Sequence, residues 1–370
     1  MAALILTCGT GGGHDAAAFA IEEELNRRGI RTVILNPYSL YSRTLEEKIN
    51  HGYISLVQNC PVCFGLIYKL GEIYRNLPFH SPVYKFNSKM VRVMAEYLSR
   101  NYFDIVIVTH LFAAEIMTQM KNEGLNIPKT ILVVTDYTCI PFTEETNCDA
   151  YVIPDPDLTD EFSGRGIPKE KIYPLGIPIR SEFTYQVSKE LSRKKLGIEN
   201  SDRFILISGG SIGAGKIEEA IHLLLAQCSF KMKLAVICGN NKRVYARLSE
   251  KYGDSIRIIQ STMRMADYIR ACDLYLTKPG GLSSTEAAAV GVPLVHLPPI
   301  PGCETKNAEF FYRHKISFRI RKVKKDMMQT IALMKDSLWK AEMIKNQKRI
   351  IRRNSTSKIC DLVLQMISPF

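Results

Sequence analysis

The chain has 370 residues, of which 46% are hydrophobic and 23% are charged. This length suits two domains of about 150–200 residues each, and the composition is that of a folded globular protein, so each half can bury its own core. The formal net charge of +12 favours a polyanionic partner, either nucleic acid or the anionic face of a membrane, and charge alone does not choose between them. No stretch of the sequence approaches the roughly 18–20 consecutive apolar residues needed to span a bilayer.

The ten cysteines are scattered along the chain and do not suggest a disulfide framework. No basic segment precedes the first apolar run, so a secretory signal peptide is not expected. Cys60 and Cys63 form the nearest pair, but there is no second such pair to complete a zinc site. We therefore expect reduced cysteines in a cytosolic protein, and no structural zinc.

Short β-branched runs alternate with helical patterns along the chain, which predicts an α/β protein with parallel sheets covered by helices on both faces. The first run, at residues 3–7, leads through a glycine loop into a helix at 16–28, and a second strand follows at 32–35. The other predicted strands are 104–108, 130–134, 150–153, 204–207, 233–237, 256–259, 274–276 and 293–296.

The succession of strand, glycine loop and helix occurs twice, at residues 4–28 and 204–226, and this repetition predicts two similar domains. Their boundary is expected at residues 176–180, where proline interrupts both patterns. Towards the end of the chain we predict a basic helix at 340–353, followed by a short apolar helix.

The first glycine loop, residues 9–14, directly follows a strand and opens a helix. Its glycines, Gly12 and Gly13 among them, allow a sharp turn that presents bare N–H groups at the helix start, where an anion or polar ligand can bind. His14 replaces the last glycine of the dinucleotide motif G-x-G-x-x-G, and a base there would face the crevice beyond the strand ends. A tight turn that binds no ligand is the alternative.

The second glycine loop, residues 210–216, fits the P-loop pattern G-x-x-x-x-G-K and also follows a strand. That pattern next requires Ser or Thr to hold magnesium, but the residue there is Ile217, and no convincing magnesium-binding aspartate follows on a later strand. Gly210 and Ser211 therefore fit a diphosphate cradle better than an NTPase site.

The third cluster runs from Lys278 to Glu286 and again places a glycine turn between a strand and a helix. Glu286 lies one turn into that helix, where its carboxylate could accept hydrogen bonds from both hydroxyls of a ribose. Alternatively, Glu286 only complements the helix dipole. Upstream, residues 260–267 could supply backbone groups to the edge of a nucleobase.

These clusters, taken in order, resemble the monogalactosyldiacylglycerol synthase and processive diacylglycerol glucosyltransferase family, which is related to the enzyme that adds N-acetylglucosamine to make lipid II. The resemblance covers nearly the whole chain and is carried by residues 9–14, 133–136, 176–178, 209–213, 278–286 and 304–307. It implies the GT-B fold, in which two Rossmann-like, doubly wound domains face a central cleft. The implied parts are an acceptor- and membrane-binding domain at 1–180, a nucleotide-sugar domain at 181–350, and a helix at 351–370 that crosses back to the first domain.

The resemblance also implies roles for individual residues. Glu286 is the ribose ligand, Gly280, Gly281, Leu282 and Ser283 form the diphosphate and donor loop, Gly210 and Ser211 form a second phosphate-side loop, Thr262 and Met263 lie at the uracil edge, and Glu304 and Asn307 bind sugar hydroxyls. His14 corresponds to the histidine of the catalytic loop. One departure is that family members often carry an aromatic residue and a histidine shortly after the Thr-Asp pair, whereas Asp136 is followed here by Tyr-Thr-Cys-Ile-Pro-Phe.

The family resemblance implies an inverting transfer of a hexose from a UDP-sugar to a lipid, with diacylglycerol as the first choice, and with neither a metal nor a cofactor. His14 is the first candidate for the base that takes the acceptor proton, and Asp136 is the second. Helix N-termini and Lys278 can stabilise the leaving diphosphate.

Residues 54–74 are rich in apolar and aromatic side chains, and basic residues follow at Arg75, Lys85, Lys89 and Arg92. This composition suits a segment that dips among acyl chains while its cations meet lipid headgroups. A buried helix with a solvated basic rim is the alternative. We expect a cytoplasmic protein, peripheral on the inner face of the cell membrane, whose partners are a UDP-sugar, a lipid and an anionic membrane surface rather than nucleic acid.

Two other functions stay open on the sequence alone. A GT-B sugar-nucleotide epimerase would need acids near the anomeric carbon and no lipid surface. A nucleic-acid-binding ATPase is favoured only by the net charge and by the near match to the P-loop.

Overall fold

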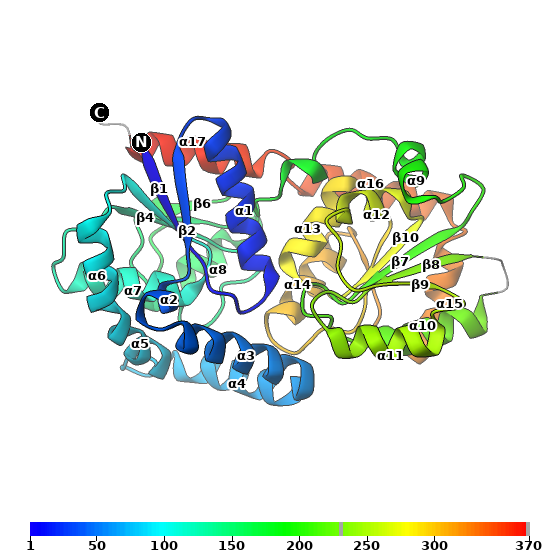
Figure 1. Ribbon diagram of the computed structural model, residues 1–370, viewed down its shortest axis with the longest axis horizontal. Coiled ribbons are helices and arrows are strands. Elements are labelled where there is room, and N and C mark those ends of the chain that lie inside the picture. The colour runs from blue at the N-terminus through cyan, green and yellow to red at the C-terminus, as the bar shows by residue number, and fades with distance from the viewer. Residues whose placement is uncertain (229–231, 368–370) are drawn as a thin grey trace. The chain divides into compact units, whose positions relative to one another are not determined.

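The computed structural model describes residues 1–228 and 232–367. The chain forms two compact units, the first made of Met1–Arg180 together with Arg353–Phe370 and the second of Ser181–Arg352. The division after Arg180 falls where the sequence analysis ends its first domain. The final helix belongs to the first unit, which is drawn in blue to green and red in Figure 1.

The first unit is built on a six-stranded sheet in the order β2-β1-β3-β4-β5-β6, and all of its neighbouring strands run parallel. Its strands are β1 (Ala2–Leu6), β2 (Arg31–Leu35), β3 (Ile105–Val108), β4 (Lys129–Val133), β5 (Ala150–Val152) and β6 (Ile172–Tyr173). Every residue of β1 and β3 is buried, as expected for central strands of a parallel sheet with helices on both faces. The strand order reverses between β1 and β3, which makes the carboxyl ends of these two strands the expected ligand position.

Helices cover this sheet, and some of them occupy the stretch of chain that would form a further strand in a Rossmann sheet. They are α1 (Gly12–Arg27), α2 (Pro37–Tyr41), α3 (Arg43–Asn59), α4 (Pro61–Tyr74), α5 (Pro82–Asn87), α6 (Val91–Arg100), α7 (Leu111–Asn122), α8 (Thr159–Gly164) and α17 (Ser355–Ile367). Five of them, α2 to α6, follow one another between β2 and β3 without an intervening strand. The first unit therefore lacks the strand that a Rossmann sheet places beyond β2.

The returning helix α17 packs on α1, the helix that follows the first glycine loop. Arg28, which caps the end of α1, pairs with Asp361 at 2.6 Å and donates a hydrogen bond to Ser357 Oγ at 2.8 Å. Ile359 and Val363 are fully buried in the same hydrophobic cluster as Ile21 of α1. The end of the chain thus completes the core of the first unit.

The second unit has a sheet in the order β12-β11-β10-β7-β8-β9, again with all neighbours parallel. Its elements are α9 (Lys189–Leu196), β7 (Phe204–Ser208), α10 (Ile217–Gln227), β8 (Lys233–Ile237), α11 (Lys242–Tyr252), β9 (Arg257–Ile259), α12 (Met265–Ala271), β10 (Leu274–Thr277), α13 (Gly281–Val290), β11 (Leu294–His296), α14 (Cys303–Arg313), β12 (Phe318–Arg319), α15 (Val323–Leu333) and α16 (Ser337–Ile350). In chain order this is the 3-2-1-4-5-6 arrangement of a Rossmann sheet, and its direction reverses between β7 and β10.

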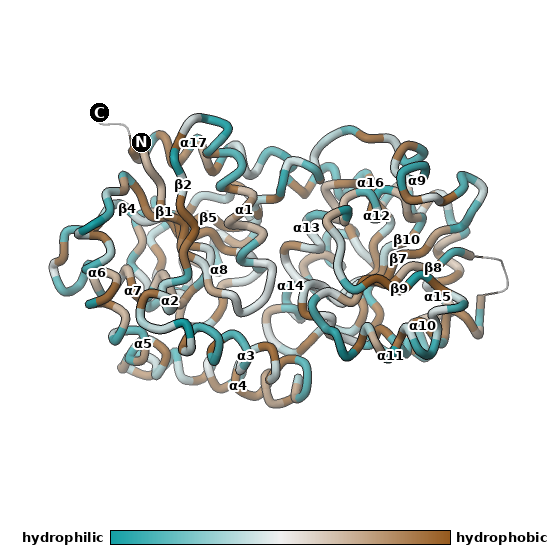
Figure 2. The backbone as a smooth tube through the Cα atoms, viewed as in Figure 1, coloured by the Kyte–Doolittle hydropathy of each residue, from teal (hydrophilic) through white to brown (hydrophobic). Residues whose placement is uncertain are grey.

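The hydrophobic core of each unit lies on its own sheet. Figure 2 shows the hydrophobic colour concentrated in the central strands, such as β1 in the first unit and β7 in the second. In the second unit Ile205, Ile207, Leu274 and Leu276 are all fully buried in one cluster. The predicted class, two doubly wound α/β domains, is confirmed by these two sheets.

Two predictions about local structure need correction. Cys60 and Cys63, expected to be reduced, are joined by a disulfide across the first turn of α4, because Cys60 caps this helix and brings the two Cα atoms within 5.3 Å. The basic helix predicted at 340–353 is α16, which starts at Ser337 after an Asp336 cap and ends at Ile350. Within the described residues, no helix has the length and apolar character that a membrane span requires.

Candidate active site

The first glycine loop and the loop after β3 leave the sheet at the point where the strand order of the first unit reverses. Gly12 and Gly13 form the first turn of α1, and Gly11 before them has a φ of 136°, a conformation that side chains disfavour. His14 follows in the same turn. The sequence therefore places its candidate base at the edge of the sheet where open α/β sheets bind ligands.

The ring of His14 is held by two partners from the loops that follow β3 and β4. Its Nδ1 lies 2.7 Å from the carbonyl oxygen of Thr109, which can only accept a hydrogen bond, and Thr135 Oγ1 lies 3.1 Å from the same nitrogen. We therefore assign the proton to Nδ1, which leaves the lone pair on Nε2. In this tautomer Nε2 is the atom that can accept a proton from a substrate.

A second histidine, His110, is hydrogen-bonded to Thr10 of the first glycine loop. It caps α7 by accepting the N–H of Phe112 at Nδ1, at 3.2 Å, so its Nε2 donates to Thr10 Oγ1 at 2.7 Å. Burial, with a smaller contribution from His14, lowers the pKa of His110 well below its usual range, which keeps the ring neutral. Its ring centroid lies 4.6 Å from that of His14, with the two rings at 72°.

His14 and Asp136 line one small cavity in the first unit, together with Ile140 and Thr143 of the loop that follows Asp136. The cavity measures about 30 Å³, which is enough for one water-sized group such as a hydroxyl. The structure thus brings together the two residues predicted as alternative bases, although they are 122 positions apart in the chain (136 minus 14).

In the second unit, the glycine loop after β7 and the turn after β10 lie side by side at the reversal of the strand order. Gly210 has a φ of 68°, and a Cβ at this position would lie 2.7 Å from Lys278 Cε, so glycine is needed where the lysine stem crosses the loop. Gly213 has a φ of 56°, and a Cβ there would collide with the carbonyl of Cys238. The loop is therefore a compact turn beneath Lys278.

The near match to a P-loop does not have P-loop geometry. Lys216 is exposed and lies 3.4 Å from Glu219 on α10, so its charge is directed at the helix. Ile217, at the position of the magnesium-binding Ser or Thr, is buried in the hydrophobic core. Neither Lys216 nor Ile217 is therefore placed as the corresponding residues of an NTPase site are.

The turn after β10 carries a partly buried ion pair. Lys278 Nζ pairs with Glu304 Oε1, and the other oxygen of Glu304 accepts the N–H of Ile300 at 3.1 Å. Glu304 is thereby fixed at the start of α14 and holds the ammonium group of Lys278 beside Gly280. Glu286 is buried on α13, the helix that Gly280 opens.

The remaining predicted donor residues occupy different settings. Gly281 and Leu282 are buried and Ser283 is half-buried in the first turn of α13, while Ser211, on the glycine loop, is exposed. Thr262 accepts the N–H of Arg264 at 3.0 Å before α12, and the side chain of Met263 is 80% exposed. Asn307 is fully buried and donates to the carbonyl of Pro279 at 3.1 Å, so it stabilises the turn that follows β10.

Two family descriptions match this chain, one on each unit. Residues 14–179 match "Monogalactosyldiacylglycerol (MGDG) synthase", and residues 204–358 match "Glycosyltransferase family 28 C-terminal domain". The chain is thus similar to the monogalactosyldiacylglycerol synthase family in its first half and to glycosyltransferase family 28 in its second half. It is therefore a hexosyltransferase, and its two halves carry the two parts of such an enzyme.

Relatives that match nearly the full length of the chain are also glycosyltransferases. The chain is 26% identical over 369 residues to the processive diacylglycerol beta-glucosyltransferase of Bacillus pumilus (strain SAFR-032), covering 98% of this chain and 94% of the relative. It is also 26% identical over 366 residues to the enzyme of the same name from Bacillus cereus (strain AH187), covering 98% and 92%.

Solved structures share the GT-B fold. Acinetobacter baumannii MurG has a TM-score of 0.65 at 16% identity, covering 98% of this chain and 99% of that one. Arabidopsis thaliana UGT89C1, complexed with UDP, has a TM-score of 0.67 at 15% identity, covering 99% and 100%. The UDP-GlcNAc 2-epimerase of Neisseria meningitidis also matches, with a TM-score of 0.59, so the fold alone does not separate transferase from epimerase.

Sequence reasoning missed two histidines of this glycosyltransferase. His110 is one, and His296 is the other: its Nε2 lies 2.9 Å from Ser284 Oγ on α13, and its Nδ1 lies 3.1 Å from Ser317 Oγ. Full burial lowers the pKa of His296 to about 3. The signal in the sequence is position, because His110 is the second residue after β3 and His296 ends β11.

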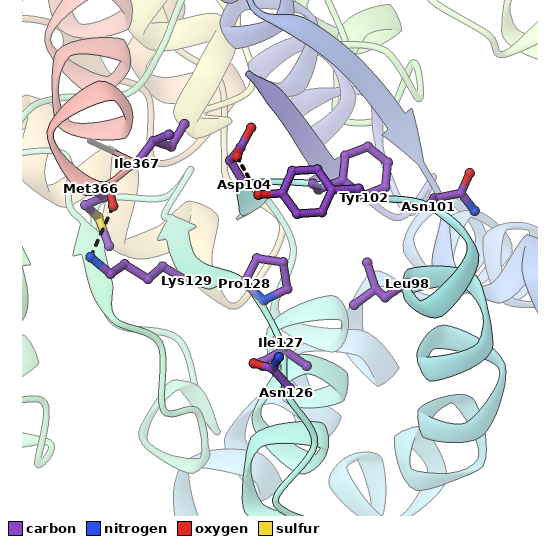
Figure 3. A pocket seen from close by; sticks show the side chains of 11 residues that line it. Leu98, Asn101, Tyr102, Asp104, Asn126, Ile127, Pro128, Lys129, Met366 and Ile367 are labelled. Carbon is purple, nitrogen blue, oxygen red and sulfur yellow. Dashed lines mark hydrogen bonds between the residues drawn. The ribbon is translucent and has the colours of Figure 1, made fainter. Parts of the chain in front are cut away.

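A larger hollow of about 520 Å³ lies elsewhere in the first unit, at the amino-terminal ends of its strands. Figure 3 shows its lining, with Lys129 bonded to the carbonyl of Met366 and Tyr102 to Asp104. None of the predicted site residues lines it. Since open parallel sheets bind ligands at the carboxyl ends of their strands, we assign the chemistry to the smaller cavity.

Proposed function

We propose that this enzyme transfers a hexose from a UDP-sugar to diacylglycerol at an anionic membrane surface. The observation that carries the lipid part of the proposal is an exposed apolar row on α4, in the same unit as His14 and Asp136. Val62, Leu66, Leu70 and Ile73 are each between 54% and 77% exposed.

These four residues repeat at helical spacing and so form one face of α4. The opposite face holds Gly65 and Gly71, which are buried, so the helix is anchored on one side and apolar on the other. Leu77 and Phe79, which follow the helix, are also exposed. A contiguous apolar face of this kind marks an interaction site, and the alternative of a wholly buried helix does not fit it.

Exposed cations on α4 and on the elements that follow it support an anionic surface as the partner. Lys69 on α4, and Lys85, Lys89 and Arg92 further along, are exposed. Arg75, predicted to be part of this set, is not available, because only 12% of its side chain is exposed and its guanidinium lies 3.1 Å from Glu144. The remaining cations suit anionic headgroups around an inserted apolar face.

For the chemistry we propose that His14 Nε2 takes the proton of the acceptor hydroxyl as its oxygen attacks the anomeric carbon. The C–O bond to UDP breaks with inversion, and the diphosphate leaves with the electron pair. The Thr109 carbonyl keeps the Nδ1 proton in place and stabilises the imidazolium that forms. Asp136, in the same cavity, is the second candidate base.

On the donor side, we propose that Lys278 and the N–H groups at the start of α13 stabilise the leaving diphosphate without a metal. The first turn of α13 contains no acidic residue that would oppose an anion there. Glu304 keeps the ammonium group at the turn until a diphosphate binds. Glu286 is proposed as the ribose ligand; contacts of Asn307 with the donor sugar stay a prediction.

Two binding measurements test the proposal and its alternatives. UDP should raise the melting temperature through its preferential binding to the folded state, and ATP should not. Sedimentation with vesicles should show stronger binding to anionic than to neutral lipid, and this difference should shrink with salt. Stabilisation by ATP alone would favour the ATPase, whereas release of an epimerised sugar in the absence of lipid would favour the epimerase.

A further inference from the structure

The loop that follows Asp136, residues 137–146, packs against the inner face of α4. A Cβ added to Gly71 would lie 3.3 Å from Pro141 Cβ and 3.5 Å from the Phe142 ring, so the helix and the loop approach as closely as a glycine allows. The ring of Tyr74 meets that of Phe142 edge-on, at 6.2 Å. Helix α4 thus exposes its apolar face on one side and packs against this loop on the other.

The loop is held in a conformation that it would not adopt unaided. Phe142 has a φ of 73°, in the left-handed region that a bulky side chain disfavours. Such a residue persists only where its surroundings fix it. Here the fixing contacts come from α4 and α8.

Two arginines supply those contacts. Arg75, the residue after α4, lies 3.1 Å from Glu144 and 3.4 Å from Glu72. Arg165, at the end of α8, donates to the carbonyl of Cys139 and lies 3.6 Å from Glu72 of α4. Arg75 therefore joins α4 to the loop through its ion pair with Glu144. Arg165 joins them through its ion pair with Glu72 of α4 and its hydrogen bond to the loop carbonyl.

Helix α8 also contacts Cys139 through the side chain of Glu161. Glu161 Oε1 accepts the N–H of Cys139 at 2.9 Å and the hydroxyl of Thr138 at 2.6 Å, and lies 3.6 Å from Arg165. Cys139 is thus held at both its N–H and its carbonyl by a pair one helical turn apart. The next residue, Ile140, lines the cavity of His14 and Asp136.

We infer that Arg165 and Arg75 are positioning residues that transmit membrane contact to the acceptor pocket. They fix the 137–146 loop to α4, so the cavity that receives the acceptor hydroxyl takes its full shape when α4 is seated in lipid. The inference rests on the proposed function, because it needs α4 to be the lipid-binding helix.

Hydrogen exchange with and without anionic vesicles separates the two claims. In the wild-type enzyme, vesicles should slow exchange both in peptides of α4 and in peptides covering 137–146. In Arg165→Met, the α4 peptides should still be protected while protection of the loop is lost. Protection of α4 alone in the wild type would overturn the coupling and leave membrane binding intact, and protection of neither would overturn both.

Kinetics on vesicles gives the second readout. Because a misplaced cavity disturbs the reacting geometry, Arg165→Met should lower kcat by about tenfold to a hundredfold, with UDP affinity and vesicle binding unchanged. Lys169→Met is the matched control, since Lys169 is an exposed cation that pairs with Asp160 at 3.0 Å and should leave kcat unchanged. Gly71→Ala guards against a simple folding defect, because alanine favours the helix while its Cβ presses on Pro141. Normal kcat in both Arg165→Met and Gly71→Ala would refute the inference.

Discussion

The two units share one sheet architecture but place different residues at the point where the strand order reverses. Each has a six-stranded parallel sheet whose order reverses once, and each places a glycine loop and a helix start at that reversal. In the second unit the sheet is a complete Rossmann arrangement, and the reversal holds Gly210 beneath Lys278. In the first, the helices α2 to α6 take the place of one strand, and the reversal holds His14. The difference shows how one fold can carry a lysine at the glycine turn of one copy and a histidine at the corresponding position of the other, which we propose as the diphosphate ligand and the base.

A buried neutral histidine supports each of these sites. His110 ties Thr10 of the first glycine loop to the start of α7, and His296 ties Ser284 of α13 to Ser317. Both lie at the carboxyl end of a strand and both have a pKa lowered by burial. The units therefore differ in chemistry more than in how the chemistry is held.

The largest effect should come from removing His14, the proposed base of the first unit. General-base catalysis contributes about 10²–10⁴-fold, so His14→Ala should lower kcat by roughly that factor while the Kd of UDP, the proposed ligand of the second unit, stays unchanged. Steady-state kinetics and calorimetry on the same preparation measure both quantities.

Asp136→Asn is the matched variant, because Asp136 lines the same cavity. If His14→Ala keeps most of the turnover with the same acidic limb of the pH–rate profile, whereas Asp136→Asn loses it, then Asp136 is the base.

Much of this comparison follows from the sequence. The alternation of apolar runs and helices predicts both sheets, and the glycine loops mark both sites, because a sharp turn between a strand and a helix needs glycine wherever the chain is positioned. Lys278, Glu286 and His14 belong to such motifs, and their roles in binding and catalysis stay predictions.

Other features depend on contacts between distant segments and could not be read from local patterns. Arg75 looks like a free cation until the fold places Glu144 beside it, and the hydrogen bond from Asn307 to the carbonyl of Pro279 appears only in the folded chain. His110 stands in an ordinary helix-start sequence. Its role appears only when β3 is paired beside β1 and Thr10 comes within 2.7 Å.

The second-largest effect should come from the cation of the second unit. Lys278→Met removes a charge-assisted interaction worth about 1.5–3 kcal/mol and leaves Glu304 buried without its partner. The Kd of UDP should therefore rise by about ten- to a hundredfold. Lys216→Met is the control by calorimetry, because Lys216 pairs with Glu219 on α10 and should not affect UDP. The opposite ranking of the two variants would restore the P-loop interpretation.

A smaller effect should come from the apolar face of α4. Leu66→Asp should weaken binding to anionic vesicles by about tenfold, since burying a leucine side chain is worth about 1.5–3 kcal/mol and Leu66 is more than half exposed before insertion. Leu338→Asp is the matched control, because Leu338 is an exposed leucine on α16 of the second unit. Equal losses in both variants, by vesicle sedimentation, would show that α4 is not the docking face.

The smallest effect concerns pH. The folded-state pKa of His110 and of His296 lies below the value of about 6.5 in an unfolded chain, so only the unfolded state takes up a proton as the pH falls below about 6.5. Stability should be complete above that pH and should fall below it by up to about 1.4 kcal/mol per pH unit for each histidine. Denaturant unfolding between pH 7 and 5 should show a shallower slope in His110→Asn and in His296→Asn. Unchanged slopes would contradict the claim that both rings are buried and neutral.

The central claim, a division of labour between a donor unit and a lipid-facing acceptor unit, is tested most directly by a transfer assay. Radiolabelled UDP-glucose, UDP-galactose and UDP-N-acetylglucosamine are each incubated with the enzyme and anionic vesicles containing diacylglycerol, in the presence of EDTA. The account predicts that label from one donor moves into a chloroform-soluble glycolipid, and that His14→Ala slows this transfer by about 10²–10⁴-fold while still binding UDP. Absence of labelled lipid with all three donors, or transfer that requires added magnesium, would contradict it.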